Sequence, residues 1–326
     1  MPLSTELTCL LGIELPVIEG GMQNVGFAEL AAAVSNAGGF GMITALTFAD
    51  PKALAQEIEK CRALTANPFG VNISVFPTMR PPDYGAIVDA IADAGVEFVE
   101  TAGTPEVREV WEMLKARGIG IIHKCTSIRH AMSAQQHGAA AIAIDGFECA
   151  GHPGEDDIPG LILIPRAVDQ LAVPVIASGG FADGRGLVAA LALGACGITM
   201  GTRFCATREA AIHPQVKAAY VANSERDTVL LYREFRNTAR VGRNRLAESV
   251  AEITSRPGAV FGDVAERVSG IKGREVLETG DMEAGIYWAG MSQGLIDDIP
   301  CCADLLGRIA ADAESIIRER LAGMLT

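Results

Sequence analysis

The chain of 326 residues carries 27 lysines and arginines against 40 aspartates and glutamates, which gives a net charge of −13 at pH 7. This excess of negative charge repels nucleic-acid backbones and anionic membrane surfaces, so a small molecule is the expected partner. Although 49% of the residues are hydrophobic, no apolar stretch approaches the roughly 20 residues of a bilayer span, and the N-terminus lacks the charged and apolar regions of a signal peptide. We therefore expect a cytoplasmic protein, monomeric or homodimeric, without membrane insertion and without a nucleic-acid partner.

Short β-branched segments alternate with longer, alanine-rich segments between residues 14 and 204. This alternation is typical of parallel βαβ units. The strands that we expect are Pro16–Glu19, Phe40–Thr44, Phe69–Val75, Phe98–Glu100, Gly120–Lys124, Ala140–Ile144, Val175–Ala177 and Gly197–Met200. Eight strands with helices between them close a (β/α)8 barrel, so residues 1–206 are predicted to form a TIM barrel. An open doubly wound sheet is the alternative, but the GxGxxG turn that such a sheet uses for a dinucleotide is missing from the sequence.

The pattern changes after the eighth strand. Residues 207–280 show helical periodicity and no convincing strand, which predicts a smaller helical subdomain inserted at this point. Residues 281–326 end in an amphipathic stretch that is expected to pack back on the barrel. Four arginines of the subdomain lie at helical spacing, which indicates a solvated or interface face, with a nucleotide-diphosphate clamp as the weaker alternative; they are Arg233, Arg236, Arg240 and Arg243.

Small residues follow the seventh and eighth strands, at residues 178–180 and 201–202. Backbone N–H groups can approach a phosphate closely where side chains are small. The loops after these two strands form the phosphate site that recurs in TIM barrels. The sequence therefore predicts a phosphorylated cofactor held by Ser178, Gly179, Gly180, Met200, Gly201 and Thr202.

Groups suited to a flat, polar ligand stand at other strand ends. The loop Gly20, Gly21, Met22 and Gln23 can lie against a planar ring and hydrogen-bond a flavin nitrogen, or it is simply a tight βα turn. Polar side chains also end four apolar strands and imply either a ligand or an internal network; they are Thr44, Asn72, Lys124 and Asp145. Lys124 can stabilise negative charge on a reduced cofactor or form a salt bridge to Asp145.

The loop after the sixth strand, residues 145–157, contains one of only five histidines. His152 is flanked by glycine and proline, and at the catalytic face it can act as a general base or bind a substrate oxygen. A metal site built from His152, Glu155 and Asp156 is the rival interpretation, but no second histidine is suitably spaced, so no metal is expected. The eight cysteines show no CxxC pair, and Cys149 is expected to be a reduced core thiol.

Four motifs together resemble the nitronate monooxygenase (2-nitropropane dioxygenase) superfamily, and most closely its bacterial FMN-dependent NADH:quinone reductases. The motifs are residues 20–23, residues 148–157 with Ala150, Gly151 and His152, residues 178–186, and residues 200–204. The resemblance implies a TIM barrel with tightly but non-covalently bound FMN and a helical domain over its mouth. It also implies that Gly21, Met22 and Asn72 touch the isoalloxazine, that Lys124 lies near it, and that His152 lies beside the flavin. Gly151, Ser178, Gly180, Gly201 and Thr202 would hold the phosphate.

The resemblance assigns a further loop, Pro77, Thr78, Met79 and Arg80, to the substrate or nicotinamide nucleotide. Met79 stands where glutamine is expected, and Arg80 suggests the 2′-phosphate of NADPH. The main hypothesis is an NAD(P)H:quinone reductase that works by ping-pong hydride transfer through FMN. The alternatives are a nitronate monooxygenase that oxidises alkyl nitronates with O2, an enoyl-thioester reductase with a basic entrance, and a flavin-binding protein without turnover.

Overall fold

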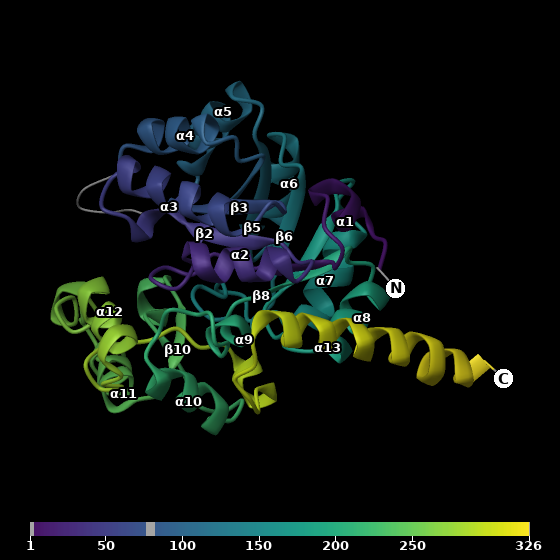
Figure 1. The fold of residues 1–326 in the computed structure, drawn as a ribbon. Coiled ribbons are helices and arrows are strands. Elements are labelled where there is room, and N and C mark those ends of the chain that lie inside the picture. The colour runs from purple at the N-terminus through teal and green to yellow at the C-terminus, as the bar shows by residue number, and fades with distance from the viewer. Residues whose placement is uncertain (1–2, 76–81, 326) are drawn as a thin grey trace.

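Eight parallel strands form a nearly closed barrel in the computed structural model, which describes residues 3–75 and 82–325 (Figure 1). Their order around the barrel is β1-β8-β7-β6-β5-β4-β3-β2. Their bounds are β1 (Val17–Glu19), β2 (Gly41–Thr44), β3 (Phe69–Val75), β4 (Phe98–Gly103), β5 (Gly120–Cys125), β6 (Ala141–Asp145), β7 (Val175–Ser178) and β8 (Gly197–Met200). The predicted TIM barrel is confirmed.

The seam between β1 and β2 closes the barrel. A single parallel bridge joins Ile18 to Phe40, and the amide of Met42 in β2 donates to the side-chain Oε2 of Glu19 at 3.1 Å. A carboxyl group therefore takes the place of a backbone carbonyl in the ladder. The helix α1 (Glu6–Leu11) covers the bottom of the barrel, where its Leu7 and Leu11 pack with the inward-facing side chains of the strands.

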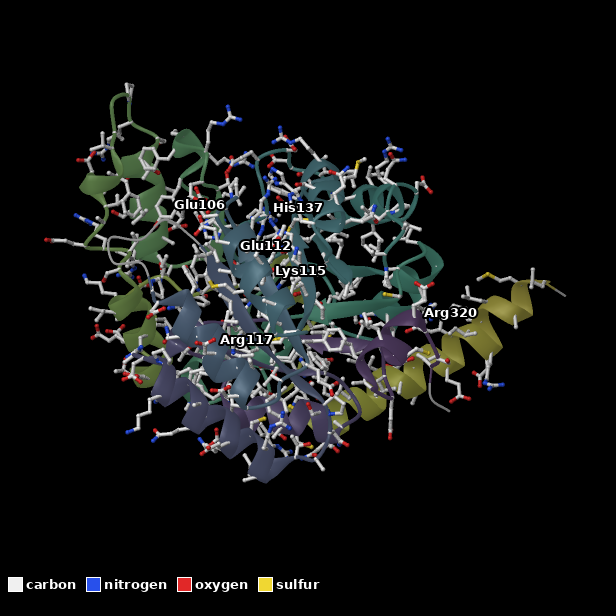
Figure 2. The ribbon with its side chains drawn as sticks, turned by 90° about the horizontal axis from the view of Figure 1, so that it is seen from above. Glu106, Glu112, Lys115, Arg117, His137 and Arg320 are labelled. Carbon is white, nitrogen blue, oxygen red and sulfur yellow. The ribbon has the colours of Figure 1, made fainter. Side chains whose placement is uncertain are left out.

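Helices surround the barrel between successive strands: α2 (Ala28–Asn36), α3 (Pro51–Leu64), α4 (Tyr84–Asp93), α5 (Val107–Ala116), α6 (Ile128–Gln136), α7 (Gly160–Val168) and α8 (Gly184–Ala192). Short polar side chains accept hydrogen bonds at several of their N-termini, as Asp50 does for α3 and Ser127 for α6. Neighbouring helices are also tied on the outside, where Lys115 of α5 donates to the carbonyl of His137 after α6 (Figure 2). None of the helices in the described ranges has both the length and the apolarity needed to cross a bilayer.

A second unit follows β8, and it is not purely helical. It contains α9 (Thr202–Cys205), α10 (Pro214–Ala222), α11 (Arg245–Thr254), η3 (Phe261–Asp263) and α12 (Gly270–Thr279), together with an antiparallel hairpin of β9 (Thr228–Leu231) and β10 (Ala239–Gly242). This hairpin was not predicted, because its two strands lie in the region 207–280, where the spacing of the residues suggested helices. An isolated bridge between Gly151 and Arg240 joins the hairpin to the loop after β6.

The arginines at apparent helical spacing lie on different elements, so the prediction of one helical face is wrong. Arg233 begins the 3-10 helix η2 (Arg233–Phe235), and Arg236 follows it with a positive φ of 53°. Arg240 is buried in β10, where its guanidinium donates to the carbonyl of Phe147 at 3.0 Å and lies over the Phe147 ring. The spacing of three to four residues here comes from a turn and a strand.

The C-terminal region divides into two parts. Residues 281–301, with η4 (Met291–Leu295), run along the second unit and the mouth of the barrel. The helix α13 (Cys302–Ser315) then packs against α8 and α2 through Leu305, Leu306 and Ile309, and the chain ends in the helical turns η5 (Ile316–Leu321) and η6 (Ala322–Leu325). In Figure 1 the last turns project away from the barrel.

Candidate active site

A cavity of about 810 Å³ opens at the carboxyl ends of the barrel strands, and residues of the second unit also line it. It brings together every residue for which the sequence predicts a catalytic or cofactor-binding role within the described ranges: Gly20, Gly21, Met22, Gln23, Thr44, Asn72, Lys124, Asp145, Ala150, Gly151, His152, Ser178, Gly179, Gly180, Met200, Gly201 and Thr202. The predicted nucleotide loop, Pro77, Thr78, Met79 and Arg80, lies outside the described residues.

The polar side chains of Asn72, Lys124 and Asp145 form the floor of this cavity. Glu100, which was not predicted as a site residue, connects the polar groups on one side of this floor. Its Oε1 accepts hydrogen bonds from Asn72 Nδ2 at 2.9 Å and from the backbone N–H of Gly21 at 3.2 Å. Its Oε2 lies 3.5 Å from the ammonium group of Lys124. The side chain is 1% exposed and lies behind the cavity lining. Glu100 faces Asn72 across the β3–β4 register, so the alternation of inward-facing residues was the signal that identifies it.

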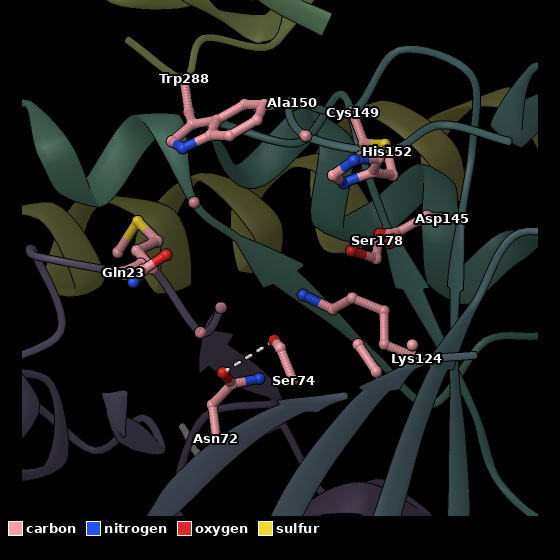
Figure 3. Close-up of a pocket in the computed structure, with 18 of the residues that line it drawn as sticks. Gln23, Asn72, Ser74, Lys124, Asp145, Cys149, Ala150, His152, Ser178 and Trp288 are labelled. Atoms are coloured by element: carbon pink, nitrogen blue, oxygen red, sulfur yellow. Dashed lines mark hydrogen bonds between the residues drawn. The ribbon is translucent and has the colours of Figure 1, made fainter. Parts of the chain in front are cut away.

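Lys124 extends into the cavity between Asn72 on one side and Asp145 on the other (Figure 3). Burial alone would lower the pKa of Lys124, but the carboxylates of Glu100 and Asp145 outweigh it, and the pKa is raised. Burial raises the pKa of Asp145, against the opposing effects of Lys124 and a hydrogen bond with Ser178. The sequence analysis left open a salt bridge between Lys124 and Asp145; the ion pair that the structure contains joins Lys124 to Glu100.

The loop after β1 lies so close to its neighbours that a side chain is excluded at Gly21 and would be crowded at Gly20. A Cβ at Gly21 would lie 2.2 Å from Cγ of Asn72, and a Cβ at Gly20 would lie 3.1 Å from Cγ2 of Thr199. The following amide, that of Met22, donates to Oγ1 of Thr44 at 2.9 Å. The two glycines therefore allow the backbone of this loop to form part of the cavity wall.

The loops after β7 and β8 form the opposite wall. Gly179 and Gly180 both have positive φ angles, 83° and 89°, which favour glycine. A Cβ at Gly179 would also lie 2.8 Å from Cβ of Cys149. After β8, Thr202 accepts a hydrogen bond from the N–H of Gly290 at 3.0 Å, which ties this wall to the segment 281–301.

His152 stands on the loop after β6, at the edge between barrel and second unit. The preceding Gly151 has a φ of 79° and exchanges two backbone hydrogen bonds with Arg240, of 3.0 and 2.6 Å. Burial lowers the pKa of His152, with Glu155 acting in the opposite direction, so the imidazole is uncharged at neutral pH. Burial also raises the pKa of Cys149 well above its usual value, and a protonated, buried thiol is a poor nucleophile.

Residues of the segment 281–301 complete the cavity, although the sequence analysis expected this part of the chain only to pack on the barrel. Tyr287, Trp288, Gly290 and Ser292 all line it. The carbonyl of Trp288 accepts a hydrogen bond from the hydroxyl of Tyr220 at 2.8 Å. Trp288 is one of only two tryptophans in the chain, and a rare, large aromatic residue outside the barrel pattern was the available signal.

Comparison with known proteins identifies the class to which this barrel and cavity belong, an oxidoreductase class. The family model "Nitronate monooxygenase" matches residues 4–84 and 79–312, so the chain belongs to the nitronate monooxygenase family. The superfamily predicted from the motifs is thereby confirmed.

Three similar proteins illustrate the range of the relatives. A (3aS,4S,5R,7aS)-5-hydroxy-7a-methyl-1-oxo-octahydro-1H-indene-4-carboxyl-CoA dehydrogenase of Rhodococcus jostii (strain RHA1) is 32% identical over 346 residues, which cover 95% of this chain and 96% of that protein. A probable nitronate monooxygenase of Staphylococcus saprophyticus is 30% identical over 362 residues, covering 97% and 99%. The solved structure of FabK from Thermotoga maritima superposes with a TM-score of 0.91 at 34% identity and covers 99% of each chain.

Proposed function

We propose that this chain is an FMN-dependent oxidoreductase that takes a hydride from NAD(P)H and delivers it to a conjugated carbonyl compound, with a quinone as the first candidate. The observation that carries the proposal is the division of one cavity into two walls. One wall contains Gly179 and Gly180, both with positive φ angles. The opposite side of the cavity contains hydrogen-bonded polar groups around the ammonium group of Lys124. FMN has the matching halves, a phosphate and a planar ring.

The residues present fit FMN at both ends. Ser178, Gly179, Gly180, Gly201 and Thr202 would hold the phosphate, because these lining residues have small side chains or none and their backbone N–H groups can approach a phosphate closely. The loop Gly20–Met22 would lie against the ring, where Gly21 leaves no room for a Cβ and the backbone is exposed to the cavity. When bound, FMN supplies the ability to accept a hydride and to pass the electrons on.

Lys124 and Glu100 would set the electrostatics of this site. A cation beside the ring stabilises negative charge that develops there on reduction. Glu100 fixes the position of that cation and, through the same carboxylate, the amide of Asn72 and the N–H of Gly21. The floor is therefore arranged before any substrate binds.

His152 would bind the oxygen of the acceptor. An uncharged imidazole can donate a hydrogen bond from one nitrogen and accept a proton at the other. Because the pKa of His152 is lowered, the imidazole stays uncharged at pH values at which an ordinary histidine would be protonated. We expect the acid limb of the rate of acceptor reduction to lie below pH 6.5, and we expect His152→Asn to remove that limb.

A second candidate substrate is an enoyl thioester of coenzyme A. The Rhodococcus relative is a dehydrogenase named for a carboxyl-CoA compound, and an enoyl thioester is a conjugated carbonyl compound like a quinone. The nitronate monooxygenase reaction is the third candidate, since the family carries that description.

Anaerobic flavin reduction tests these possibilities. The purified holoenzyme is mixed with NADH, with NADPH or with propionate 3-nitronate, and the absorbance of oxidised flavin is followed. We expect rapid bleaching with one of the two nicotinamide nucleotides, then reoxidation by menadione, with crotonyl-CoA as the parallel acceptor. Bleaching by the nitronate alone would contradict the proposal and favour the nitronate reaction, and protein purified without flavin would contradict all three candidates.

A further inference from the structure

The cavity has an arm that the sequence analysis did not identify. It extends past the ends of β4 and β5 toward the N-terminal turns of α5 and α6. Arg108 of α5 and His130 and Ser133 of α6 line it, together with the hydroxyl groups of Thr104 and Thr126. These residues share the catalytic edge of the barrel because the helices begin where the strands end.

The arm carries positive charge without acidic partners. Arg108 donates to the hydroxyl of Ser133 at 3.0 Å, and Arg129 donates to Nε2 of His130 at 3.3 Å. In the part of the chain that the structure describes, no ion pair joins an acidic residue to Arg108 or Arg129.

The acidic residues among the described cavity lining are directed elsewhere. The carboxylate of Glu155 accepts hydrogen bonds from the N–H and the hydroxyl of Thr238, at 2.7 and 2.6 Å. Asp145 lies on the floor near Lys124 and Ser178 (Figure 3). Glu106, at the N-cap of α5, lies outside the cavity lining although it precedes Arg108 by two residues. An anion that enters the arm therefore meets arginine and hydroxyl groups.

We propose that Arg108, with Ser133, His130 and the neighbouring threonines, forms a subsite for the phosphate groups of a nucleotide co-substrate. A guanidinium group beside several hydroxyl groups suits the oxygens of a phosphate, with which it makes charge-assisted hydrogen bonds. The subsite rests on the proposed function, in which the reactive end of the co-substrate lies at Lys124 and His152. Two co-substrates contain such phosphate groups, NAD(P)H and a coenzyme A thioester, and the subsite would bind the diphosphate of either.

Equilibrium binding to the holoenzyme tests the subsite without turnover. Isothermal titration calorimetry is carried out with ADP, adenosine 2′,5′-bisphosphate, coenzyme A and adenosine, on the unchanged protein and on Arg108→Ala. The control is Lys115→Ala, which removes a cation from the other end of the same helix, outside the cavity lining (Figure 2). The probe that binds the unchanged protein most tightly identifies the source of the phosphate.

We expect Arg108→Ala to weaken the binding of that probe about tenfold, as loss of a charge-assisted hydrogen bond does. Adenosine should bind all three proteins equally, and Lys115→Ala should behave like the unchanged protein. Failure of every phosphate probe to bind the unchanged protein would overturn the proposal, and so would equal binding by Arg108→Ala.

Steady-state kinetics separate the subsite from the proposed function. In Arg108→Ala the KM of the phosphate-bearing substrate should rise about tenfold, whereas kcat and the KM of menadione, which has no phosphate, should change less than about twofold. If no nicotinamide nucleotide reduces the flavin, the proposed function fails, yet the calorimetric comparison still decides on the subsite.

Discussion

The rings of His152 and Trp288 lie beside each other at the mouth of the cavity, with their centroids 5.9 Å apart and their planes inclined at 44° (Figure 3). The histidine belongs to the loop after β6, and the tryptophan comes from the segment that follows α12. Hydrogen bonds fix the backbone around Trp288, since its carbonyl accepts from Tyr220 and the carbonyl of Tyr287 accepts from Gly242 at 2.8 Å. The indole, 39% exposed, is thus a large apolar surface in a fixed position beside His152.

We expect Trp288→Ala to raise the KM for a planar quinone about fivefold, because a stacked aromatic contact contributes about 1 kcal/mol. Trp288→Phe keeps an aromatic face and should stay within about twofold of the unchanged protein. Steady-state kinetics at saturating nicotinamide nucleotide measure the effect, and the flavin content of each variant serves as the control. A rise of equal size in both variants would show that the stacking surface is not the cause.

The pair Glu100 and Lys124 predicts opposite changes in the reduction potential of a bound flavin. Glu100→Gln removes a negative charge but keeps an oxygen that can accept from Asn72 and Gly21, so the potential should rise. Lys124→Met removes the positive charge and should lower it. Changes on the order of 30 mV correspond to about 1.4 kcal/mol for a two-electron couple.

Anaerobic redox titration measures both potentials, and Lys115→Met, which removes a surface cation paired with Glu112, should leave the potential unchanged. Shifts of the same sign in both floor variants would indicate general disruption of the site, and they would contradict the electrostatic role of the pair.

The barrel was predictable from sequence because each strand and helix is specified by its own apolar pattern. The strand limits differ from the predicted ones by a few residues, mostly at the polar ends, as at Ser178 of β7. The hairpin of the second unit was not predictable in the same way. One of its strands, β10, contains the buried charge of Arg240, which is stabilised by contacts with Phe147 far away in sequence.

The site residues divide in the same way into those that a local sequence pattern predicts and those that depend on contacts between distant segments. Residues at strand ends, such as Asn72 and Lys124, follow from the barrel, because the carboxyl ends of its strands share one edge. The alternation along β4 places Glu100 on the inward-facing side and could have predicted it as a site residue, but it was predicted only as part of a strand. Trp288 and Arg108 reach the cavity through the packing of the second unit and through the start of a helix, and the apolar pattern that predicts the strand ends does not include either residue.

His123 predicts a loss of stability in mild acid. It lies on the outer side of β5, 4% exposed, with Nδ1 3.1 Å from the hydroxyl of Thr101 and with its ring against Trp111. Burial lowers its pKa from 6.5 to about 4, and nearby His130 acts in the same direction. The unfolded chain therefore binds a proton at a pH at which the folded protein does not, and the free energy of unfolding falls as the pH decreases from 6.5 to about 4.

The expected loss over this range is about 3 kcal/mol, at about 1.4 kcal/mol for each pH unit. Urea unfolding at intervals between pH 4 and pH 7 measures it. His123→Asn can keep the contact with Thr101 and does not titrate, so its stability should depend less steeply on pH whatever its absolute value. His130→Asn, on the exposed surface, is the control and should retain most of the slope. Parallel curves for the unchanged protein and His123→Asn would contradict this assignment.

Glu19 predicts a change in the opposite direction, at higher pH. It is fully buried at the seam of the barrel, where Oε2 accepts from Met42 and Oε1 has no hydrogen-bond partner among the residues that the structure describes. Burial raises its pKa well above 4.5; the hydrogen bond from Met42 opposes this shift, and the charge of Glu100 adds to it. The folded protein therefore keeps a proton that the unfolded chain releases, and stability falls with rising pH from about 4.5 to the raised pKa of the folded state, by about 1.4 kcal/mol per pH unit.

We expect Glu19→Gln to be more stable than the unchanged protein at pH 8 and to lose this advantage near pH 4.5. The amide keeps an acceptor for Met42 and cannot ionise, which removes the pH-dependent cost of protonation. Urea unfolding across this range measures the difference. Glu57→Gln is a matched control, because Glu57 also accepts a backbone N–H, that of Ala28, but lies 3.6 Å from the ammonium group of Lys60. Its replacement should not stabilise the protein at pH 8, and a Glu19→Gln protein with the pH slope of the unchanged chain would show that Glu19 is ionised at the seam.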